Sequence, residues 1–204
     1  MMRILAIETA TEACSVALFE DGALLDARHE VLGRGHAERL VPMIAELPGK
    51  GRAEQIRVSL GPGSFTGVRI GLAVARALGI AWQAEVRGYP TLALVAAMAQ
   101  AESDEPVTVC MAGGHGEWFV QDFGTDGLPT DEVVSLVPEV AAQRAAKGVL
   151  AGSKAEELGD IARAPVAAIR LPDARHALAL PDSLLGAGLA PLYGRPPDAR
   201  PTVR

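Results

Sequence analysis

The glycine-rich segment Gly61–Gly67 is the first part of this 204-residue sequence where chemistry could take place. It separates two apolar stretches, and a glycine-rich turn at the start of a helix can direct backbone N–H groups at a phosphate. The Gly-Lys-Ser/Thr sequence of a Walker loop is missing, however, and Ser64 does not belong to the G-x-S-x-G sequence of a nucleophile elbow. We therefore expect no catalytic residue here. We interpret the segment as a structural turn formed by Gly61, Gly63, Ser64, Thr66 and Gly67.

The histidines and cysteines do not form a pattern typical of a metal site. The four histidines are scattered along the chain: His29, His36, His115 and His176. No two of them are four residues apart, the spacing that places both imidazoles on one face of a helix. Cys14 and Cys110 are far apart and form no C-x-x-C, which favours small buried residues over a disulfide or a thiolate site. We expect no metal site and no cofactor.

The composition is that of a globular protein, with 49% hydrophobic and 22% charged residues. A formal net charge of -6 argues against a surface that binds nucleic acid unaided, because phosphate binding needs clustered Lys and Arg. Trp118 and Phe119 could stack on bases, but without basic neighbours we interpret them as core residues. Glu8 interrupts the apolar N-terminus, which argues against a signal peptide, and no membrane span is expected. We expect a cytoplasmic protein.

Apolar periodicity predicts the elements that position these residues. In the first half we predict strands over Arg3–Glu8, Cys14–Phe19, Ala23–Val31, Ile56–Leu60 and Glu85–Gly88. The predicted helices are Ala37–Leu47, in which Pro42 should start or kink the regular part, Val68–Ala81, and Thr91 to about Gln100. Thr91 is the expected N-cap of the last one, and Ser64 or Thr66 could cap the second.

The polar stretch Glu102–Pro106 predicts a domain junction, with one domain over residues 1–102 and a second over 103–204. The second half repeats the first in reduced form. Its predicted elements are the strands Val107–Met111, Glu117–Phe123 and Gly148–Ala151 and the helix Pro138–Lys147. The proline-rich end, from Pro191 to Arg204, should be extended along the surface.

The predicted helix Val68–Ala81 is apolar around most of its circumference, since only Arg69 and Arg76 are polar. Such a helix must be covered on two sides, by the protein's own sheet and by a partner, because exposure would leave a large apolar patch. Small residues recur every four positions, at Gly67, Gly71, Ala75 and Gly79, and form a ridge that would let another helix approach closely. The alternative is a helix fully buried inside one domain.

Several stretches of the chain carry a recognisable pattern. Gly61–Gly67 followed by Val68-Arg69-Ile70-Gly71 resembles the G-P-G-S-F-T-G-x-R-x-G signature of the TsaB (YeaZ) family. Ile4–Leu18 is similar to the first hairpin of that family, and Gly35–Leu40 to the entrance of its first helix. The ending Pro191–Arg195 resembles its P-x-Y-x-R close.

Other parts depart from the family pattern. The family's Asp-Ala-Arg near a Glu-x-Tyr is replaced here by Met111–His115 and Glu117–Phe119. The region between about Pro165 and Pro191 is short, so we expect abbreviated C-terminal helices.

The resemblance implies an α/β protein with the actin/hexokinase-like ATPase (ASKHA) fold, made of two ribonuclease-H-like subdomains of which the second is reduced. It also implies a non-catalytic subunit in the biosynthesis of threonylcarbamoyladenosine, a modified adenosine next to the tRNA anticodon. The implied partners are a TsaD-like catalytic paralogue and a TsaE-like ATPase, with tRNA reached only through the complex. Members of the family pair through their two N-terminal helices and self-associate through the same face when alone.

The resemblance and the apolar helix together predict a partner interface on the first two helices. We predict that its residues are Leu40, Met43, Ile44, Val68, Arg69, Leu72, Ala75 and Arg76. On this assignment, Leu72→Asp should abolish pairing and leave the monomer folded.

Two functions of other classes stay open as alternatives. One is a small-molecule kinase or ATPase of the actin-like superfamily, in which the glycine turn is a working phosphate loop. Such enzymes hold phosphate and Mg²⁺ at the first hairpin, where this chain has Glu8, Thr9, Thr11 and Glu12. The second half offers no glycine-rich adenosine clamp, which favours plain turn residues. The other alternative, suggested by the glycoprotease-like label of the family, is a peptidase.

Overall fold

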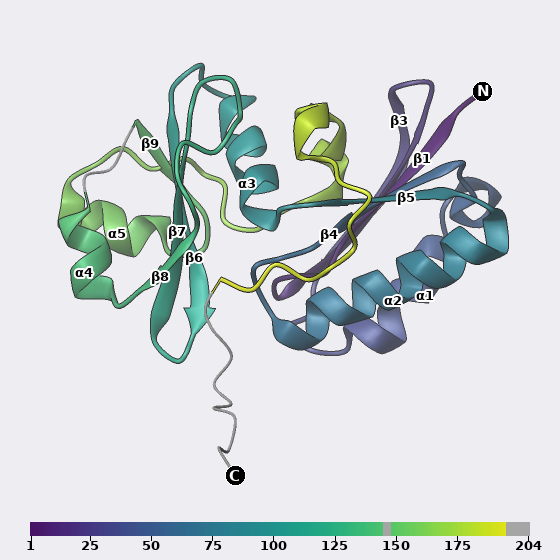
Figure 1. The fold of residues 1–204 in the computed structure, drawn as a ribbon, viewed down its shortest axis with the longest axis horizontal. Coiled ribbons are helices and arrows are strands. Elements are labelled where there is room, and N and C mark those ends of the chain that lie inside the picture. The colour runs from purple at the N-terminus through teal and green to yellow at the C-terminus, as the bar shows by residue number, and fades with distance from the viewer. Residues whose placement is uncertain (145–147, 195–204) are drawn as a thin grey trace, which may run out of the picture.

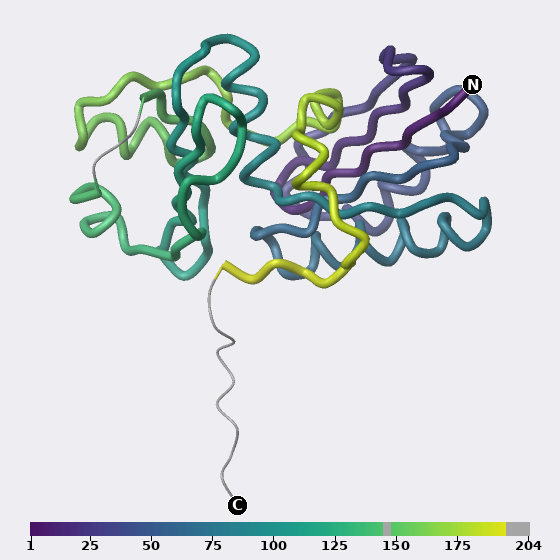
Figure 2. The backbone as a smooth tube through the Cα atoms, turned by 45° about the horizontal axis from the view of Figure 1, so that its top comes forward, coloured from purple at the N-terminus to yellow at the C-terminus, as the bar shows by residue number. Residues whose placement is uncertain are grey.

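The computed structural model describes residues 1–144 and 148–194, which form two lobes side by side (Figures 1 and 2). Each lobe is built on one mixed sheet. The N-lobe sheet has the strand order β3-β2-β1-β4-β5, and the sheet of the second lobe has the order β8-β7-β6-β9. The chain is therefore an α/β protein, as expected.

The N-lobe begins as an antiparallel meander and continues with parallel strands. Its elements are β1 (Arg3–Glu8), β2 (Ala13–Glu20), β3 (Ala23–Val31), α1 (His36–Ala45), β4 (Gln55–Ser59), α2 (Phe65–Trp82) and β5 (Glu85–Tyr89), with a short 3-10 turn over Pro48–Gly51. Asp21 and Gly22, both with positive φ, make the hairpin turn between β2 and β3. The predicted strands and helices of this half are confirmed, with ends shifted by a few residues.

Two helix starts differ from the prediction. Helix α1 begins at His36, so Pro42 lies inside the helix, and of the two predicted alternatives, a start or a kink, the start is wrong. Helix α3 (Thr91–Gln100) has Pro90 at the N-cap position, and no side chain caps it. The hydroxyl of Thr91 instead lies 2.5 Å from the hydroxyl of Ser59, so this side chain joins α3 to the end of β4.

The core of the N-lobe lies between the sheet and helices α1 and α2. Leu5 and Ile7 of β1 point into it, as does Val58 of β4. Successive side chains of a strand point to opposite faces, so Ala6 and Glu8 point to the other face. Helices α1 and α2 lie side by side across the first of these faces (Figure 1).

Helix α2 is made of small residues on one face because that face lies directly on the sheet. A Cβ atom at Gly67 would collide with the carbonyl oxygen of Thr9, and one at Gly71 with the Thr9 hydroxyl. Gly79 lies equally close to Val86 of β5. The predicted small-residue ridge exists, but it serves approach to the chain's own sheet and not approach of a helix from another chain.

Length and composition alone would let α2 cross a membrane, with a mean hydropathy of 1.3 over 18 residues. It is the one helix of the described residues that meets both criteria. Core helices of α/β domains meet the same criteria, and here Val68, Leu72 and Ala75 are buried on the N-lobe sheet.

The second lobe holds its sheet between helices on both faces. Its elements are α3, β6 (Val107–Gly114), β7 (Glu117–Phe123), β8 (Val134–Leu136), α4 (Pro138–Gln143), β9 (Val149–Ala151) and α5 (Ala155–Ala162). Helix α3 covers one face, and α4 and α5 cover the other. The predicted elements of this half are present, but β8 and α5 were not predicted. The last residues of the predicted helix Pro138–Lys147 lie outside the described residues.

After α5 the chain returns to the N-lobe. We expected abbreviated C-terminal helices. In their place the structure has two 3-10 turns, Ala174–Ala179 and Asp182–Leu184. Ala174 and Ala177 pack on Ile4 and Ala6 of β1. Packing therefore departs from the predicted division at residue 102, because α3 packs in the second lobe and the returning segment packs on the first.

The segment from residue 186 to residue 194, which we call the strap, runs along the N-lobe towards the second lobe (Figure 2). Gly186 pairs with Gly88 of β5 through two backbone hydrogen bonds of 2.8 and 3.0 Å. The N–H of Leu192 donates to the carbonyl oxygen of Leu60 at 2.7 Å. Pro191 belongs to this extended segment, and the rest of the predicted proline-rich end lies outside the described residues.

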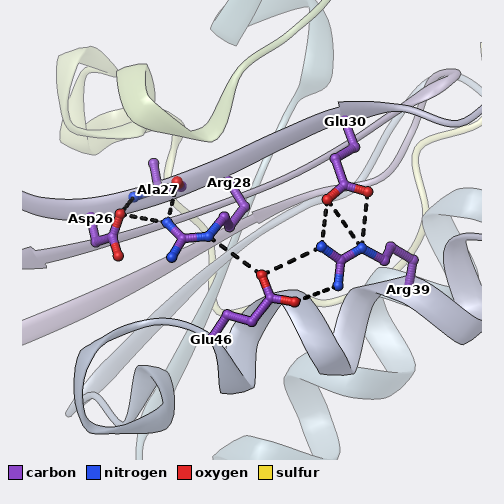
Figure 3. A network of polar contacts seen from close by, with 6 residues as sticks. All are labelled: Asp26, Ala27, Arg28, Glu30, Arg39 and Glu46. Atoms are coloured by element: carbon purple, nitrogen blue, oxygen red, sulfur yellow. Dashed lines mark hydrogen bonds and ion pairs between the residues drawn. The ribbon is translucent and has the colours of Figure 1, made fainter.

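A network of ion pairs ties α1 to the edge strand β3 (Figure 3). Arg39 of α1 contacts the carboxylate of Glu30 on β3 at 2.5 Å and that of Glu46 at 2.6 Å. Arg28 of β3 contacts Glu46 at 3.4 Å and Asp26 at 2.5 Å. Hydrogen bonds from Arg39 hold the pKa of Glu30 and of Glu46 below the ordinary range. The network fixes the orientation of α1 at the surface of the lobe.

Replacing Gly67 by Ala should lower the free energy of unfolding by about 2 kcal/mol, because the added methyl group must displace either α2 or the backbone of Thr9. Urea unfolding followed by circular dichroism measures the change. Gly188→Ala is the matched control, since a Cβ atom at Gly188 meets no heavy atom within 4 Å. Equal midpoints for the two variants would contradict the close packing of α2 on the sheet.

Candidate functional site

The glycine turn joins β4 to α2 and packs against the turn between β1 and β2. The N–H of Ser64 donates to the carbonyl oxygen of Ala10 at 2.6 Å, and the hydroxyl of Thr9 donates to the carbonyl oxygen of Gly67 at 2.8 Å. A Cβ atom at Gly63 would collide with the carbonyl group of Ala10. Glycine is required here because two turns of the backbone touch.

Ser64 is the N-cap of α2, as one of the two predicted alternatives. Its hydroxyl accepts a hydrogen bond from the N–H of Gly67 at 3.2 Å. Thr66 is exposed in the first turn of the helix, and Gly61, with a φ of 89°, lies under the strap. Because the N–H groups of Ser64 and Gly67 are both used inside the chain, these two are not directed at a phosphate.

The predicted partner-interface residues do not share one exposed face. Six of the eight are at most 4% exposed: Leu40, Met43, Ile44, Val68, Leu72 and Ala75. They pack in the core of the N-lobe, so the structure corrects this choice of residues. Of the eight predicted residues, only Arg69 and Arg76 reach solvent. Leu72→Asp would therefore place a carboxylate in the core and destabilise the monomer itself.

The surface that α1 and α2 leave exposed, which we call the outer face, is nevertheless apolar. It consists of Ala37, Glu38, Val41, Ala45, Phe65, Arg69, Ala73, Arg76, Ala77 and Ile80. Val41 is 52% exposed, Phe65 60% and Ile80 83%. Helix α2 is therefore not fully enclosed by its own chain, because the side that faces away from the sheet is exposed.

The strap contacts the outer face through both of its arginines. Arg69 donates a hydrogen bond to the hydroxyl of Tyr193 at 2.8 Å, and its guanidinium lies 3.2 Å from the centroid of the Phe65 ring. The rings of Phe65 and Tyr193 stack with their centroids 6.1 Å apart. Arg76 donates to the carbonyl oxygen of Leu189 at 2.9 Å.

A cleft of about 1320 Å³ opens between the two lobes, next to the start of the outer face. The N-lobe contributes Thr11 and Glu12 from the first turn, and segments 33–38 and 62–67. The second lobe contributes the β6–β7 hairpin at 111–115, and the end of the strap forms a further wall. This cleft is larger than the roughly 300 to 1,000 Å³ of most small-molecule pockets.

Glu8 is fully buried and is not among the residues that line the cleft. Its Oε1 accepts a hydrogen bond from the N–H of Ala10 at 2.7 Å, whereas Oε2 has no partner of good geometry among the described residues. Complete burial raises the pKa of Glu8 to about 7, although Ala10 and the nearby hydroxyls of Ser59 and Tyr89 favour the ionised form. Of the two carboxylates in the first turn, only Glu12 is open to the cleft.

Other candidate chemistry is buried or dispersed. Within residues 1–144 and 148–194, no group of three or more His, Cys, Asp or Glu is arranged to hold a metal ion. Cys14 and Cys110 are free and buried, and burial raises their pKa to about 11 and about 12. Such thiols are not nucleophiles near neutral pH.

Sequence reasoning missed the exposed apolar residues and the strap. The signal for the first was present: Arg69 and Arg76 are seven residues apart and must face solvent, so Ala73 and Ile80 on the same side must be exposed as well. The contacts of Tyr193 and Leu189 with these arginines join positions more than a hundred residues apart, and no local pattern indicates them.

Glu8→Gln should make the free energy of unfolding less dependent on pH. The folded pKa of about 7 lies above the ordinary value of 4.5, so the wild-type protein loses stability as the pH rises from about 4.5 to about 7. The variant should match the wild type near pH 5 and exceed it at pH 8 by about 3 kcal/mol, at about 1.4 kcal/mol per pH unit. Urea unfolding at the two pH values measures this, with Glu12→Gln as the control. If the free energies of unfolding of the wild type and of Glu8→Gln differ by the same amount at both pH values, the prediction is wrong.

Comparison with known proteins gives consistent matches. A family model described as "TsaD: tRNA N6-adenosine threonylcarbamoyltransferase" matches residues 29–174. The tRNA threonylcarbamoyladenosine biosynthesis protein TsaB of Escherichia coli (strain K12) is 36% identical over 155 residues, which are 70% of this chain and 66% of that protein. The TsaB protein of Haemophilus influenzae is 39% identical over 105 residues, which are 49% of this chain and 43% of that protein. The matched segment thus spans less than two thirds of either relative.

Solved structures extend the match over nearly the whole chain. The structure described as YeaZ from Pseudomonas aeruginosa has a TM-score of 0.78 and 30% identity, covering 95% of this chain and 100% of that chain. A structure described as an uncharacterized protein with similarity to peptidase YEAZ, from the same organism, has a TM-score of 0.80 and 30% identity. The signature at Gly61–Gly71, the family model and these structures agree, and the chain belongs to the TsaB (YeaZ) family.

Proposed function

We propose that this protein is a non-catalytic subunit in the biosynthesis of threonylcarbamoyladenosine in tRNA, and that it pairs with and activates a TsaD-type catalytic subunit. The names of its relatives support the pathway. The single observation that carries the pairing is the outer face, along which α1 and α2 expose the large apolar side chains of Val41, Phe65 and Ile80. A helical face that leaves several large apolar side chains in water is typical of a protein interface.

Several features support a role without chemistry of its own. The glycine turn uses its polar groups to join α2 to the first turn, Ser64 serves as a helix cap, and Glu8 is buried. A function as a kinase or as a peptidase would depend on these residues. The work of this chain is then to hold the catalytic partner in its active conformation, in the cytoplasm, with a TsaE-type ATPase as the third component.

A reconstituted modification reaction tests this function. We expect the TsaD-type and TsaE-type proteins of the same genome, supplied with tRNA and a threonylcarbamoyl donor, to form the modified adenosine only when this chain is present. Mass spectrometry of digested tRNA gives the yield. Full yield without this chain would contradict the proposal, and so would a wild-type chain that binds neither protein.

The outer face can be tested with a matched pair of isoleucines. Ile80→Asp places a charge on the outer face and should weaken binding to the TsaD-type subunit by about 2 kcal/mol, near the loss of an interface hot spot. Ile161→Asp places the same charge on α5, where the side chain is 57% exposed, and should leave binding unchanged. Both variants should unfold like the wild type. Calorimetric titration measures the affinities, and equal affinities would exclude the outer face as the interface.

The cleft favours one second candidate, an actin-like kinase or ATPase, because Thr11 and Glu12 of the first turn line it, where such enzymes hold phosphate and Mg²⁺. Titration of the isolated chain with magnesium ATP separates the two functions. On the subunit proposal we expect no heat of binding from the isolated chain. Tight binding that is lost in Glu12→Gln would favour the enzyme.

A further inference from the structure

Strand β3 forms an edge of the N-lobe sheet that the chain leaves uncovered. Its inner side pairs with β2, and within the described residues no strand pairs with its outer side. β3 is nine residues long, whereas the other edge strands, β5, β8 and β9, have five, three and three residues. β5 is also partly covered, because Gly186 of the strap pairs with Gly88. A long free edge offers its backbone N–H and C=O groups to a strand of another chain.

The free backbone groups at the middle of β3 are bound by the side chains on either side of them. Ala27 lies opposite Ala17 of β2, but its N–H donates to Oδ1 of Asp26 at 2.8 Å. Its carbonyl oxygen accepts a hydrogen bond from Nη1 of Arg28, also at 2.8 Å. Figure 3 shows Asp26 and Arg28 on the two sides of Ala27, each in contact with one of its backbone groups. Both groups therefore face the open edge and not β2.

The side chains of Asp26 and Arg28, which we call the edge cap, are joined to each other by charge. The guanidinium of Arg28 contacts the carboxylate of Asp26 at 2.5 Å and that of Glu46, on α1, at 3.4 Å. The ion pair makes the two caps one unit, and Glu46 anchors that unit to the helix. Charged side chains on an edge strand are a common means of preventing another strand from pairing with it.

We propose that the outer side of β3 is a latent pairing surface for β3 of a second copy of this chain, and that the edge cap keeps it closed. The proposal does not rest on the proposed function, because it concerns β3 and not the outer face. A strand that added to this edge would have to displace two hydrogen bonds and an ion pair before it formed bonds of its own. The cap thus keeps a long strand edge from joining copies of the chain.

The sequence of β3 is complementary to itself when two copies run antiparallel about Ala27. In that arrangement Asp26 of each copy lies opposite Arg28 of the other, so that opposite charges face each other. Leu25 of each copy becomes a diagonal neighbour of Val31 of the other, and these side chains are 41% and 65% exposed. Centring the pair on Asp26 or on Arg28 would place like charges opposite each other. A second copy therefore fits this edge in one register.

Removal of the edge cap tests the proposal. All proteins carry Ile80→Asp, so that any self-association through the outer face is weakened. In this background the uncapped chain, Asp26→Ala with Arg28→Ala, leaves the N–H and carbonyl of Ala27 free. It should self-associate at least about fivefold more tightly, with a mass that rises from 21.2 kDa towards twice that value. The variant also lacks the cross-strand charge pairs, which opposes part of the gain. Sedimentation equilibrium measures the association.

Two further variants separate the edge cap from other effects. Glu46→Gln is the matched control, because it removes the anchor of Arg28 on α1 and leaves both caps in place. Its self-association should equal that of the background protein. Ala27→Pro, added to the uncapped chain, deletes the N–H that faces the edge, and proline is tolerated at such a position of an edge strand. This chain should return to the weak association of the background protein.

Hydrogen exchange locates the contact and shows that the uncapped chain is folded. Its amides at residues 23–31 should exchange more slowly in concentrated than in dilute protein. An uncapped chain that associates no more tightly than the background protein would overturn the proposal. The same holds for association that Ala27→Pro does not reduce, and for protection that appears elsewhere and not in β3. If Glu46→Gln associates like the uncapped chain, the contacts with α1 close the edge, and the proposal is wrong.

Discussion

The fold of the N-lobe depends on the contact between the glycine face of α2 and the turn that follows β1. Gly63 and Gly67 bring the backbone of one turn onto the backbone of the other, and Thr9 and Ser64 join them with hydrogen bonds. Once that contact is made, the rotation of α2 about its axis is set. This rotation decides which side chains of α2 point into the core and which are exposed.

The set rotation divides α2 into two functionally distinct sides. Val68, Leu72 and Ala75 go to the core, where they serve stability, while Phe65 and Ile80 stay in water. Covering an apolar side chain that is left in water lowers the free energy by about 25 cal/mol for each Å² of apolar surface buried. The same packing that builds the lobe therefore leaves apolar side chains of α2 exposed on its other side.

Much of the fold could be predicted from the sequence, because strands β1 to β7 and helices α1 to α3 follow local periodicity and turn residues such as Asp21 and Gly22. The glycine turn was identified for the same reason. The orientation of α2 was not, since it is apolar on nearly every side and a hydrophobic pattern cannot choose a face for it. The strap and the buried state of Glu8 depend on pairings across the chain, such as Leu192 with Leu60, that no local rule contains.

Helix α3 has a mechanical consequence for the whole molecule. All of its residues from Thr91 to Ala99 are buried, and the core around them takes Phe119 from the second sheet, Tyr89 from the end of β5 and Leu185 from the returning chain. Neither lobe can melt alone without leaving this apolar helix bare. Heating should therefore unfold both lobes in one cooperative transition, because the two lobes share the core around α3.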